Sequence, residues 1–164
     1  MIPVRRFFLL LCLQFVACSL WLSSCTTIDL YEKVEAIPKH QWQSTYKPQF
    51  TFTIKDTTAP YQLYLIVRHA NKYRYNNIWV NLYAKNPVDS VQKFSLELPL
   101  AGKEGWLGSG MDDLFEHRIA FTLDPQRFRF SSPGSYTFSL EQIMRDDPLT
   151  DVMNVGLRIE KKTQ

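Results

Sequence analysis

The sequence predicts an all-β fold: a single antiparallel β-sandwich, with an Ig-like or jelly-roll-like strand order, that follows a cleaved signal peptide. Three observations lead to this prediction. Aromatic residues make up 14% of the 164 residues and stand beside many β-branched ones, and both types pack well in strands. Apolar and polar residues alternate in short segments, as they do in a strand with one buried face. Turn signals separate these segments, and no helical period is sustained.

Each predicted strand is a short segment in which every second residue is apolar. The segments are residues 50–54, 63–67, 78–84, 94–100, 119–123, 136–140 and 155–159. We expect the fourth strand to end near Pro99, because proline lacks the N–H group that a strand ladder needs. Residues 69–77 are expected to form a polar, Asn-rich turn, and the pair Pro133 and Gly134 is typical of a turn before the sixth strand.

The first 24 residues are typical of a secretory signal peptide. Arg5 and Arg6 supply the positive start, and the apolar run at 7–22 is too interrupted for a membrane-spanning helix. Residues 22–25, Leu-Ser-Ser-Cys, resemble the bacterial lipobox, which implies that Cys25 is acylated, with palmitate among the expected chains, and becomes the new N-terminus. The alternatives are a weaker lipobox at Cys18 and an ordinary signal peptide without lipid.

This assignment divides the chain into three parts. We expect a signal peptide at 1–24, a tether from the lipidated Cys25 to residue 48, and the sandwich at 49–164. The alternative for the tether is that part of it docks on the domain through its apolar residues Tyr31, Val34, Ile37 and Trp42. All three cysteines lie at or before Cys25, so the mature chain has no pair for a disulfide. Without Arg5 and Arg6, 17 basic residues face 16 acidic ones, and this near-neutral balance argues against a nucleic-acid partner.

Catalytic and metal-binding patterns are missing from the sequence, so we expect no enzyme, no cofactor and no metal. His40, His69 and His117 fall in separate segments and form no HExxH pattern, and no GxSxG motif is present. Asp112, Asp113 and Glu116 could bind calcium or act as a glycosidase pair. Their spacing is not that of an EF-hand, however, and a solvated loop is the favoured interpretation.

One stretch combines cations with aromatic side chains, a mixture that is favoured at protein interfaces. Together with a tryptophan in a glycine-rich loop, it defines a candidate interaction surface: Arg68, Lys72, Tyr73, Arg74, Tyr75, Trp79 and Trp106. The alternative interpretation is an amphipathic strand pair with a solvated turn. Trp106 itself is expected either to pack into the core or to contact a partner.

Three stretches of the chain together resemble the gliding motility lipoprotein GldH family. They are residues 65–80, the Gly-Trp-Leu-Gly-Ser-Gly motif at 105–110, and residues 136–160, which close on Val-Gly-Leu-Arg-Ile-Glu. The resemblance implies a non-catalytic lipoprotein of the outer membrane that is required for gliding. It also implies other motility lipoproteins or type IX secretion components as partners. The family implies no catalytic residues.

Two further expectations concern function and location. Because aromatic residues line sugar sites on many β-sandwiches, a carbohydrate-binding surface lipoprotein is the alternative function. Thr26 and Thr27 follow Cys25 without an acidic cluster that would direct export, so the periplasmic face of the outer membrane is preferred over the cell surface.

Overall fold

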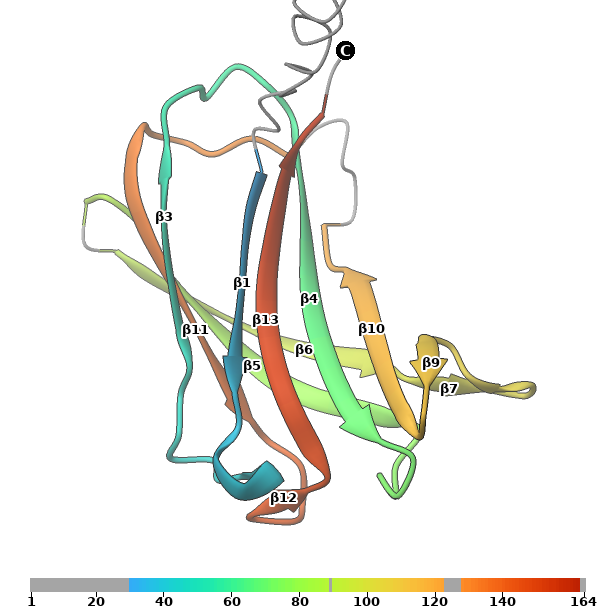
Figure 1. The fold of residues 1–164 in the computed structure, drawn as a ribbon. Helices are drawn as coiled ribbons and strands as arrows, with labels where there is room; N and C mark the ends of the chain where they lie inside the picture. Colours follow the sequence, from blue (N-terminus) through green and yellow to red (C-terminus); the bar gives the residue numbers. More distant parts are fainter. Residues whose placement is uncertain (1–29, 89, 123–127, 163–164) are drawn as a thin grey trace, which may run out of the picture.

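The computed structural model describes residues 30–88, 90–122 and 128–162, and these form one all-β domain. The signal peptide, Cys25 and Leu123 lie outside the described residues. Two antiparallel sheets pack face to face, which confirms the predicted sandwich (Figure 1). In the described ranges, no helix has the length and apolar character needed to cross a membrane.

The first sheet has five strands. Their order is β1 (Leu30–Ala36), β13 (Val152–Lys161), β4 (Tyr61–Ala70), β10 (Leu114–Ala120) and β9 (Ser109–Met111). The ladder between β4 and β13 includes a register shift between Val152 and Asn154. Strand β1 adds to the other side of β13, where Leu30 faces Glu160. The first described residues therefore lie beside the last described ones, at the top of Figure 1.

The second sheet has four strands. Their order is β3 (Gln49–Ile54), β11 (Gly134–Gln142), β5 (Asn77–Lys85) and β6 (Val91–Pro99). Two small two-stranded sheets complete the domain. One pairs β2 (Gln41–Trp42) with β12 (Leu149–Thr150), and the other pairs β7 (Ala101–Gly102) with β8 (Gly105–Trp106). A short 3-10 turn, η1, spans Pro38–His40.

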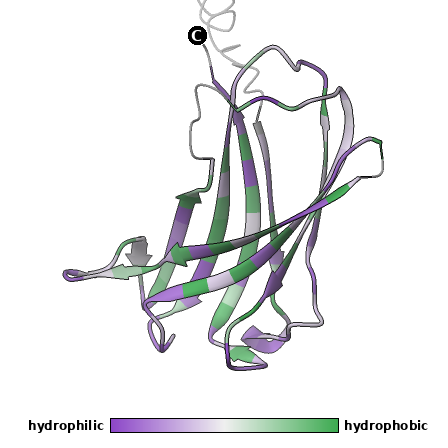
Figure 2. Cartoon of the chain, turned by 180° about the vertical axis from the view of Figure 1, so that it is seen from behind, coloured by the Kyte–Doolittle hydropathy of each residue, from purple (hydrophilic) through white to green (hydrophobic). Residues whose placement is uncertain are grey.

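The core fills the space between the two sheets. Strand β3 shows the period-two pattern directly, since its exposed and buried residues alternate along its whole length. Phe52 is at the centre of the aromatic packing, with Phe138 edge-on at 5.1 Å and Tyr136 stacked at 5.8 Å between ring centroids. Aromatic pairs of this kind add to the free energy of area burial. Figure 2 shows the resulting alternation of hydrophobic and hydrophilic bands along the strands.

The seven predicted strands occur in the structure, but two details of the prediction are wrong. The fifth strand, β10, spans Leu114–Ala120 instead of 119–123. Its inward positions include the buried His117, a polar residue that hides the alternation. The predicted turn at 69–77 begins two residues too early, because His69 and Ala70 still belong to β4.

The predicted tether to residue 48 is also wrong from Leu30 onward. Residues 30–36 form β1, and beyond them Ile37 and Trp42 are buried, Trp42 completely at 0% exposure. The Ile37 N–H donates to the Met153 carbonyl at 2.8 Å, which fastens this segment to the first sheet. A polar stretch interrupted by Pro38 and Pro48 is typical of a tether, but the polar residues of β1 are those of an edge strand whose outer side meets water.

Candidate interaction surface

The candidate surface centres on the end of the sandwich where β4 ends and β10 begins, which we call the loop end. The turn at residues 71–76 and the β7–β8 hairpin meet there (Figure 1). Asn71 ties the parts together, because its N–H donates to the Asp113 carbonyl at 2.7 Å and its side-chain oxygen accepts from Trp106 Nε1 at 2.9 Å. The turn, the β9–β10 hairpin and the Trp106 loop are therefore one unit.

An aromatic–histidine cluster forms the interior of the loop end, with members His69, Tyr73, Trp106, Phe115 and His117. The Trp106 ring lies edge-on to His69, at 4.4 Å between centroids, and Phe115 stacks on His69 at 5.8 Å. Trp106 is half-buried, so it packs on the core and still contributes to the surface. Trp106 can therefore both pack against the core and contact a partner, the two roles expected for it from the sequence.

The two histidines of the cluster are in direct contact. His69 Nε2 lies 2.9 Å from His117 Nε2, and His69 Nδ1 lies 2.8 Å from the Ala70 carbonyl oxygen. A carbonyl only accepts, so His69 donates from Nδ1, and its Nε2 accepts the proton of His117 Nε2. One hydrogen-bonded chain therefore fixes both tautomers.

Both histidines are neutral at pH 7 for a physical reason. Burial lowers the pKa of His69, against the opposing effect of the Ala70 carbonyl. Burial, with a smaller contribution from the nearby His69, lowers the pKa of His117 to about 4. The side chains are 0% and 2% exposed, so a charge on either ring would lack water to solvate it. The pair consequently acts as a packed, neutral element of the core.

Gly108 lets the glycine-rich loop approach this pair closely. A Cβ atom on Gly108 would lie 2.4 Å from the Glu116 carbonyl oxygen and 2.9 Å from His117 Cε1. Any larger residue would push the loop away from β10, and Trp106 with it. This close approach explains the glycine in the Gly-Trp-Leu-Gly-Ser-Gly motif.

The structure separates the seven predicted surface residues into three places. Tyr73 is buried and donates its hydroxyl to the Asn77 carbonyl at 2.9 Å, so it is not part of the surface as predicted. Burial, with Tyr75 and Asp146 nearby, raises its pKa. Tyr75 packs edge-on against Tyr73 at 5.8 Å. Arg74 pairs with Asp146 at 2.7 Å on the rim, and Lys72 is exposed in the turn.

Arg68 lies away from the cluster, on the outer face of the first sheet. It faces Glu116 across the ladder of β4 and β10, with 2.5 Å between Nε and the carboxylate, and Arg118 holds the other oxygen at 3.0 Å. Burial alone would raise the pKa of Glu116, but the two arginines lower it.

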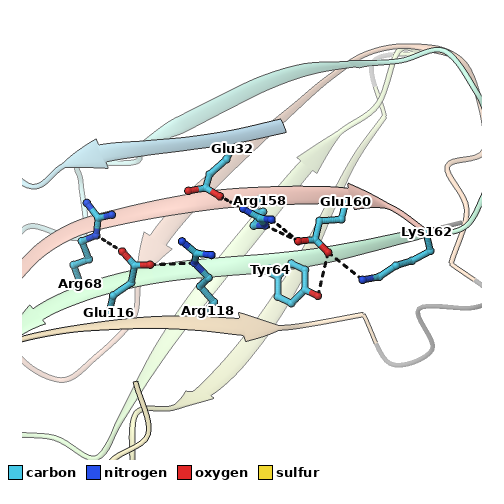
Figure 3. A network of polar contacts seen from close by, with 8 residues as sticks. All are labelled: Glu32, Tyr64, Arg68, Glu116, Arg118, Arg158, Glu160 and Lys162. Carbon is cyan, nitrogen blue, oxygen red and sulfur yellow. Dashed lines mark hydrogen bonds and ion pairs between the residues drawn. The ribbon is translucent and has the colours of Figure 1, made fainter. Parts of the chain in front are cut away.

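A second group of charges continues along the same face (Figure 3). Glu160 accepts from Arg158 at 2.6 Å and from Lys162 at 3.0 Å, and Arg158 also pairs with Glu32 on β1. Opposite charges thus face one another across neighbouring strands, an arrangement that stabilises a sheet modestly. The charges of this face largely compensate one another.

Trp79 occupies a third place, the outer face of the second sheet. It is 39% exposed, and its backbone N–H lies 3.2 Å from the Met144 sulfur. Next along the same face of β5, the carboxylate of Glu141 accepts from Asn81 at 2.9 Å and from Tyr83 at 2.6 Å. Trp79 and this polar array lie on the second sheet, whereas Arg68 lies on the first.

The acidic residues considered for calcium are placed in two settings. Asp112 and Asp113 form the two-residue turn of the β9–β10 hairpin, with φ values of 51° and 64°. Both values are in the left-handed region that such a turn requires and that aspartate tolerates. Glu116 turns instead toward its arginines. Within the described residues, no three His, Cys, Asp or Glu side chains form a group that could hold a metal ion.

The contact between His69 and His117, which are far apart in the chain, is not predicted from the sequence. The sequence does contain a signal that both rings are buried. His69 continues the inward set Leu63, Leu65 and Val67, and His117 precedes Ile119 on the same face of its strand. Period two therefore places both rings in the core. It does not say that β4 and β10 are neighbours, and that pairing makes the contact.

Two packed antiparallel sheets behind a segment that resembles a lipobox define the class of β-sandwich lipoproteins. Within this class the chain belongs to the GldH lipoprotein family, because the model of that family matches residues 29–159. The match confirms the resemblance seen in the sequence, and its start at residue 29 agrees with a domain that begins at β1. Membership of a lipoprotein family implies anchoring to a membrane.

Two curated relatives align over nearly their whole length. A gliding motility lipoprotein GldH homolog of Christiangramia forsetii is 31% identical over 147 residues, 85% of this chain and 88% of the relative. The gliding motility lipoprotein GldH of Flavobacterium johnsoniae is 25% identical over 149 residues, 86% of this chain and 90% of the relative.

Similarity to solved structures is weaker. A carbohydrate-binding module of family 28, specific for non-crystalline cellulose, aligns with 80% of this chain and 73% of its own. The TM-score is 0.46 and the sequence identity 9%. A likeness of this size gives no basis for transferring a ligand.

Proposed function

We propose that the protein is a non-catalytic gliding motility lipoprotein of the outer membrane. In this proposal acyl chains on Cys25 anchor it on the periplasmic face, and it binds other motility lipoproteins or type IX secretion components. The names of the relatives support the motility role. One observation carries the binding role: two stretches of the family resemblance meet, as His69 and Tyr73 of residues 65–80 pack against Trp106 of residues 105–110.

The anchor would hold the domain close to the bilayer. Cys25 and Leu30 are five residues apart, a distance that even an extended chain spans in about 17 Å. Because β1 starts at Leu30, ordered structure replaces most of the long tether expected from the sequence. The segment from Cys25 joins the domain at the end where Leu30 faces Glu160. The loop end, where His69 pairs with Val152, lies about 30 Å along β13 from that point.

The loop end has the composition of a protein-binding surface. Lys72 is exposed in the turn and Arg74 on the rim. Leu107 and Met111 are exposed on the adjoining loop and strand β9. Exposed apolar residues beside arginine and aromatic groups are typical of protein interfaces. A rigid cluster beneath them would limit the entropy lost when a partner binds.

The lipid anchor is tested by substituting Cys25 by Ala. We expect incorporation of an alkyne-labelled palmitate in the wild type and none in Cys25→Ala, with the variant lost from the outer-membrane fraction. Cys18→Ser is the matched control for the rival lipobox, and this variant should still incorporate the palmitate label. Label that persists in Cys25→Ala and disappears with Cys18→Ser would reassign the anchor.

The binding role is tested by recovering partners from native membranes after mild crosslinking, followed by mass spectrometry. We expect motility lipoproteins or type IX secretion components with the wild type. A charge reversal at the loop end, Lys72→Glu, should reduce their recovery, whereas the same reversal at the anchored end, Lys55→Glu, should not. Equal recovery from the two variants would argue against the loop end as the binding surface.

A carbohydrate-binding function is the second candidate, and one observation favours it. The exposed ring of Trp79 lies on the same face of β5 as Asn81 and Tyr83, which are already ordered by Glu141. Aromatic platforms beside fixed polar groups suit sugar rings. Binding on a glycan array that disappears in Trp79→Ala and persists in Trp106→Phe would support this candidate.

A further inference from the structure

We propose that β6 is a dimerisation edge, at which two copies of this chain join their second sheets through antiparallel β6–β6 pairing about Ser95. Three observations carry the inference: a long strand edge that no other described strand covers, apolar side chains exposed along it, and a charge pattern that is complementary to itself. The dimer goes beyond the proposed binding role at the loop end, because it uses a different surface.

Two backbone hydrogen bonds, one at each end of the β5–β6 pairing, show which residues of β6 direct their N–H and C=O groups toward β5. Asn86 N–H donates to the Ser90 carbonyl at 3.0 Å, and Leu100 N–H donates to the Asn76 carbonyl at 2.8 Å. The register between these ends is continuous. In an antiparallel ladder every second residue bonds to the same neighbour, so the even-numbered residues of β6 bond to β5.

The odd-numbered residues of β6 therefore direct their backbone groups away from the sheet. These residues are Val91, Lys93, Ser95 and Glu97. In the described parts of the chain β6 pairs with β5 and with no other strand, so it is the edge of the second sheet. A row of outward N–H and C=O groups is a template for another strand.

The edge lacks most devices that prevent such pairing. Natural edge strands are short, bulged, covered or interrupted by proline, whereas β6 runs for nine residues and has its proline only at the last position, Pro99. Residues 91–95 are all exposed. Phe94 is 45% exposed although its side chain is on the core-facing side of the strand with Leu96 and Leu98. An exposed phenylalanine at this position would be covered by a neighbouring strand.

A second copy supplies a strand that matches at the five central positions, 93–97. With the two-fold axis at Ser95, Lys93 faces Glu97 of the second copy, and Phe94 faces Leu96 of the second copy. The reciprocal pairs form at the same time, so two ion pairs and two apolar pairs flank a central Ser95 pair. Opposite charges and aromatic–aliphatic pairs are the cross-strand neighbours that stabilise sheets. Asn77 already binds one Glu97 oxygen at 2.7 Å, which orients the carboxylate and leaves its other oxygen for the lysine.

The symmetry has a consequence for the orientation on the membrane, which rests on the proposed anchor at Cys25. The axis of an antiparallel edge pair is perpendicular to the sheet. Both anchors can reach one bilayer only if this axis is also perpendicular to the bilayer. The sandwiches would then lie with their sheets parallel to the membrane, an arrangement that the short segment from Cys25 to Leu30 permits.

Cysteine crosslinking of the full-length lipoprotein in native membranes tests the pairing. In Ser95→Cys the two thiols would face each other at about 5.5 Å between Cα atoms, within the range for a disulfide. The matched control is Val91→Cys, on the same exposed edge, whose copies would be about 27 Å apart. We expect mild oxidation to give a dimer of this chain with Ser95→Cys and little with Val91→Cys.

Charge reversal in the Ser95→Cys background identifies the partner strand. Lys93→Glu places carboxylates opposite each other at both ends of the pair and should lower the crosslinking yield about tenfold. Adding Glu97→Lys restores opposite charges and should restore the yield. Both side chains are exposed, so thermal unfolding serves as a control that the fold is retained.

The results decide between self-pairing and its alternatives. Equal yields at positions 91 and 95, or a double reversal that does not recover, would overturn the proposal. A Ser95→Cys adduct with the mass of a different protein would overturn it too, in favour of strand addition by another partner. If the dimer forms in the lipidated protein and is lost only when Cys25→Ala is added, the proposed β6–β6 pairing stands. That result would show that the pairing requires confinement of the two copies to the membrane.

Discussion

The buried histidine pair predicts a specific loss of stability in mild acid. His117 is neutral in the folded protein down to a pKa of about 4, whereas its reference pKa is 6.5. Below pH 6.5 the unfolded chain therefore binds a proton that the folded chain does not, and stability falls as the pH falls. The loss is complete near pH 4, where the folded protein also binds the proton.

The magnitude follows from the two pKa values. Between pH 7 and pH 4.5, His117 alone should cost about 2 to 3 kcal/mol of unfolding free energy. For a domain of this size that corresponds to roughly 10 °C in melting temperature. Carboxylates also titrate in this range, so the contribution of His117 is measured by comparing the variant with the wild type. His117→Gln should lose less stability than the wild type over the same pH interval.

The assay is urea unfolding of the lipoprotein in detergent, followed by near-ultraviolet circular dichroism at the two pH values. His40→Gln is the matched control, since His40 is exposed on η1 and outside the cluster, and it should retain the full wild-type pH dependence. Equal losses of unfolding free energy in His117→Gln and the wild type between pH 7 and pH 4.5 would show that His117 does not cause the acid sensitivity.

Three further predictions concern stability, each measured by urea unfolding. Gly108→Ala should cost about 2 to 3 kcal/mol, because its Cβ would meet the Glu116 carbonyl oxygen at 2.4 Å. Trp42→Ala should cost about 3 to 5 kcal/mol, because the side chain is fully buried. Glu141→Gln should cost about 1 to 2 kcal/mol at pH 7 and little at pH 2. Hydrogen bonds, first that from Asn81, lower the pKa of Glu141 to about 2, so its stabilisation is present above pH 4.5 and lost on acidification.

Each of these predictions has a control and a contradicting result. Gly102→Ala, whose Cβ would meet only the flexible Leu107 Cδ2 at 3.3 Å, should be nearly neutral, and a cost equal to that of Gly108→Ala would contradict the close-approach argument. A mild effect of Trp42→Ala would favour the tether interpretation of residues 25–48. An equal cost of Glu141→Gln at both pH values would show that its ionisation does not matter.

The strands could be predicted because period two is a local property. The alternation of Phe50, Phe52 and Ile54 with threonines is visible in the sequence and reappears as alternating burial in β3. Strand β1 could not be predicted in the same way, because its charged residues belong to an edge and its pairing with β13 joins opposite ends of the chain. Trp42 also pairs with a distant segment, since β2 joins β12 with Trp42 opposite Leu149.

The candidate surface was predicted in part. Residues 68–79 are neighbours in sequence, which predicts one surface, but successive residues of a strand point to opposite faces. Arg68 consequently faces outward and His69 inward, and Trp79 lies on the other sheet. Tyr73 folds under the turn. The meeting of the turn with Trp106 depends on the β7–β8 hairpin, which has no local alternation to reveal it.

Site-specific photo-crosslinking in native membranes tests whether the lipid-anchored protein binds its partners through the loop end. A photoreactive amino acid would replace Lys72 at the loop end or Lys55 at the anchored end, both exposed. We expect adducts with motility lipoproteins or type IX secretion components from position 72, and none from position 55 or from Cys25→Ala. Protein adducts from position 55 and none from position 72 would contradict it.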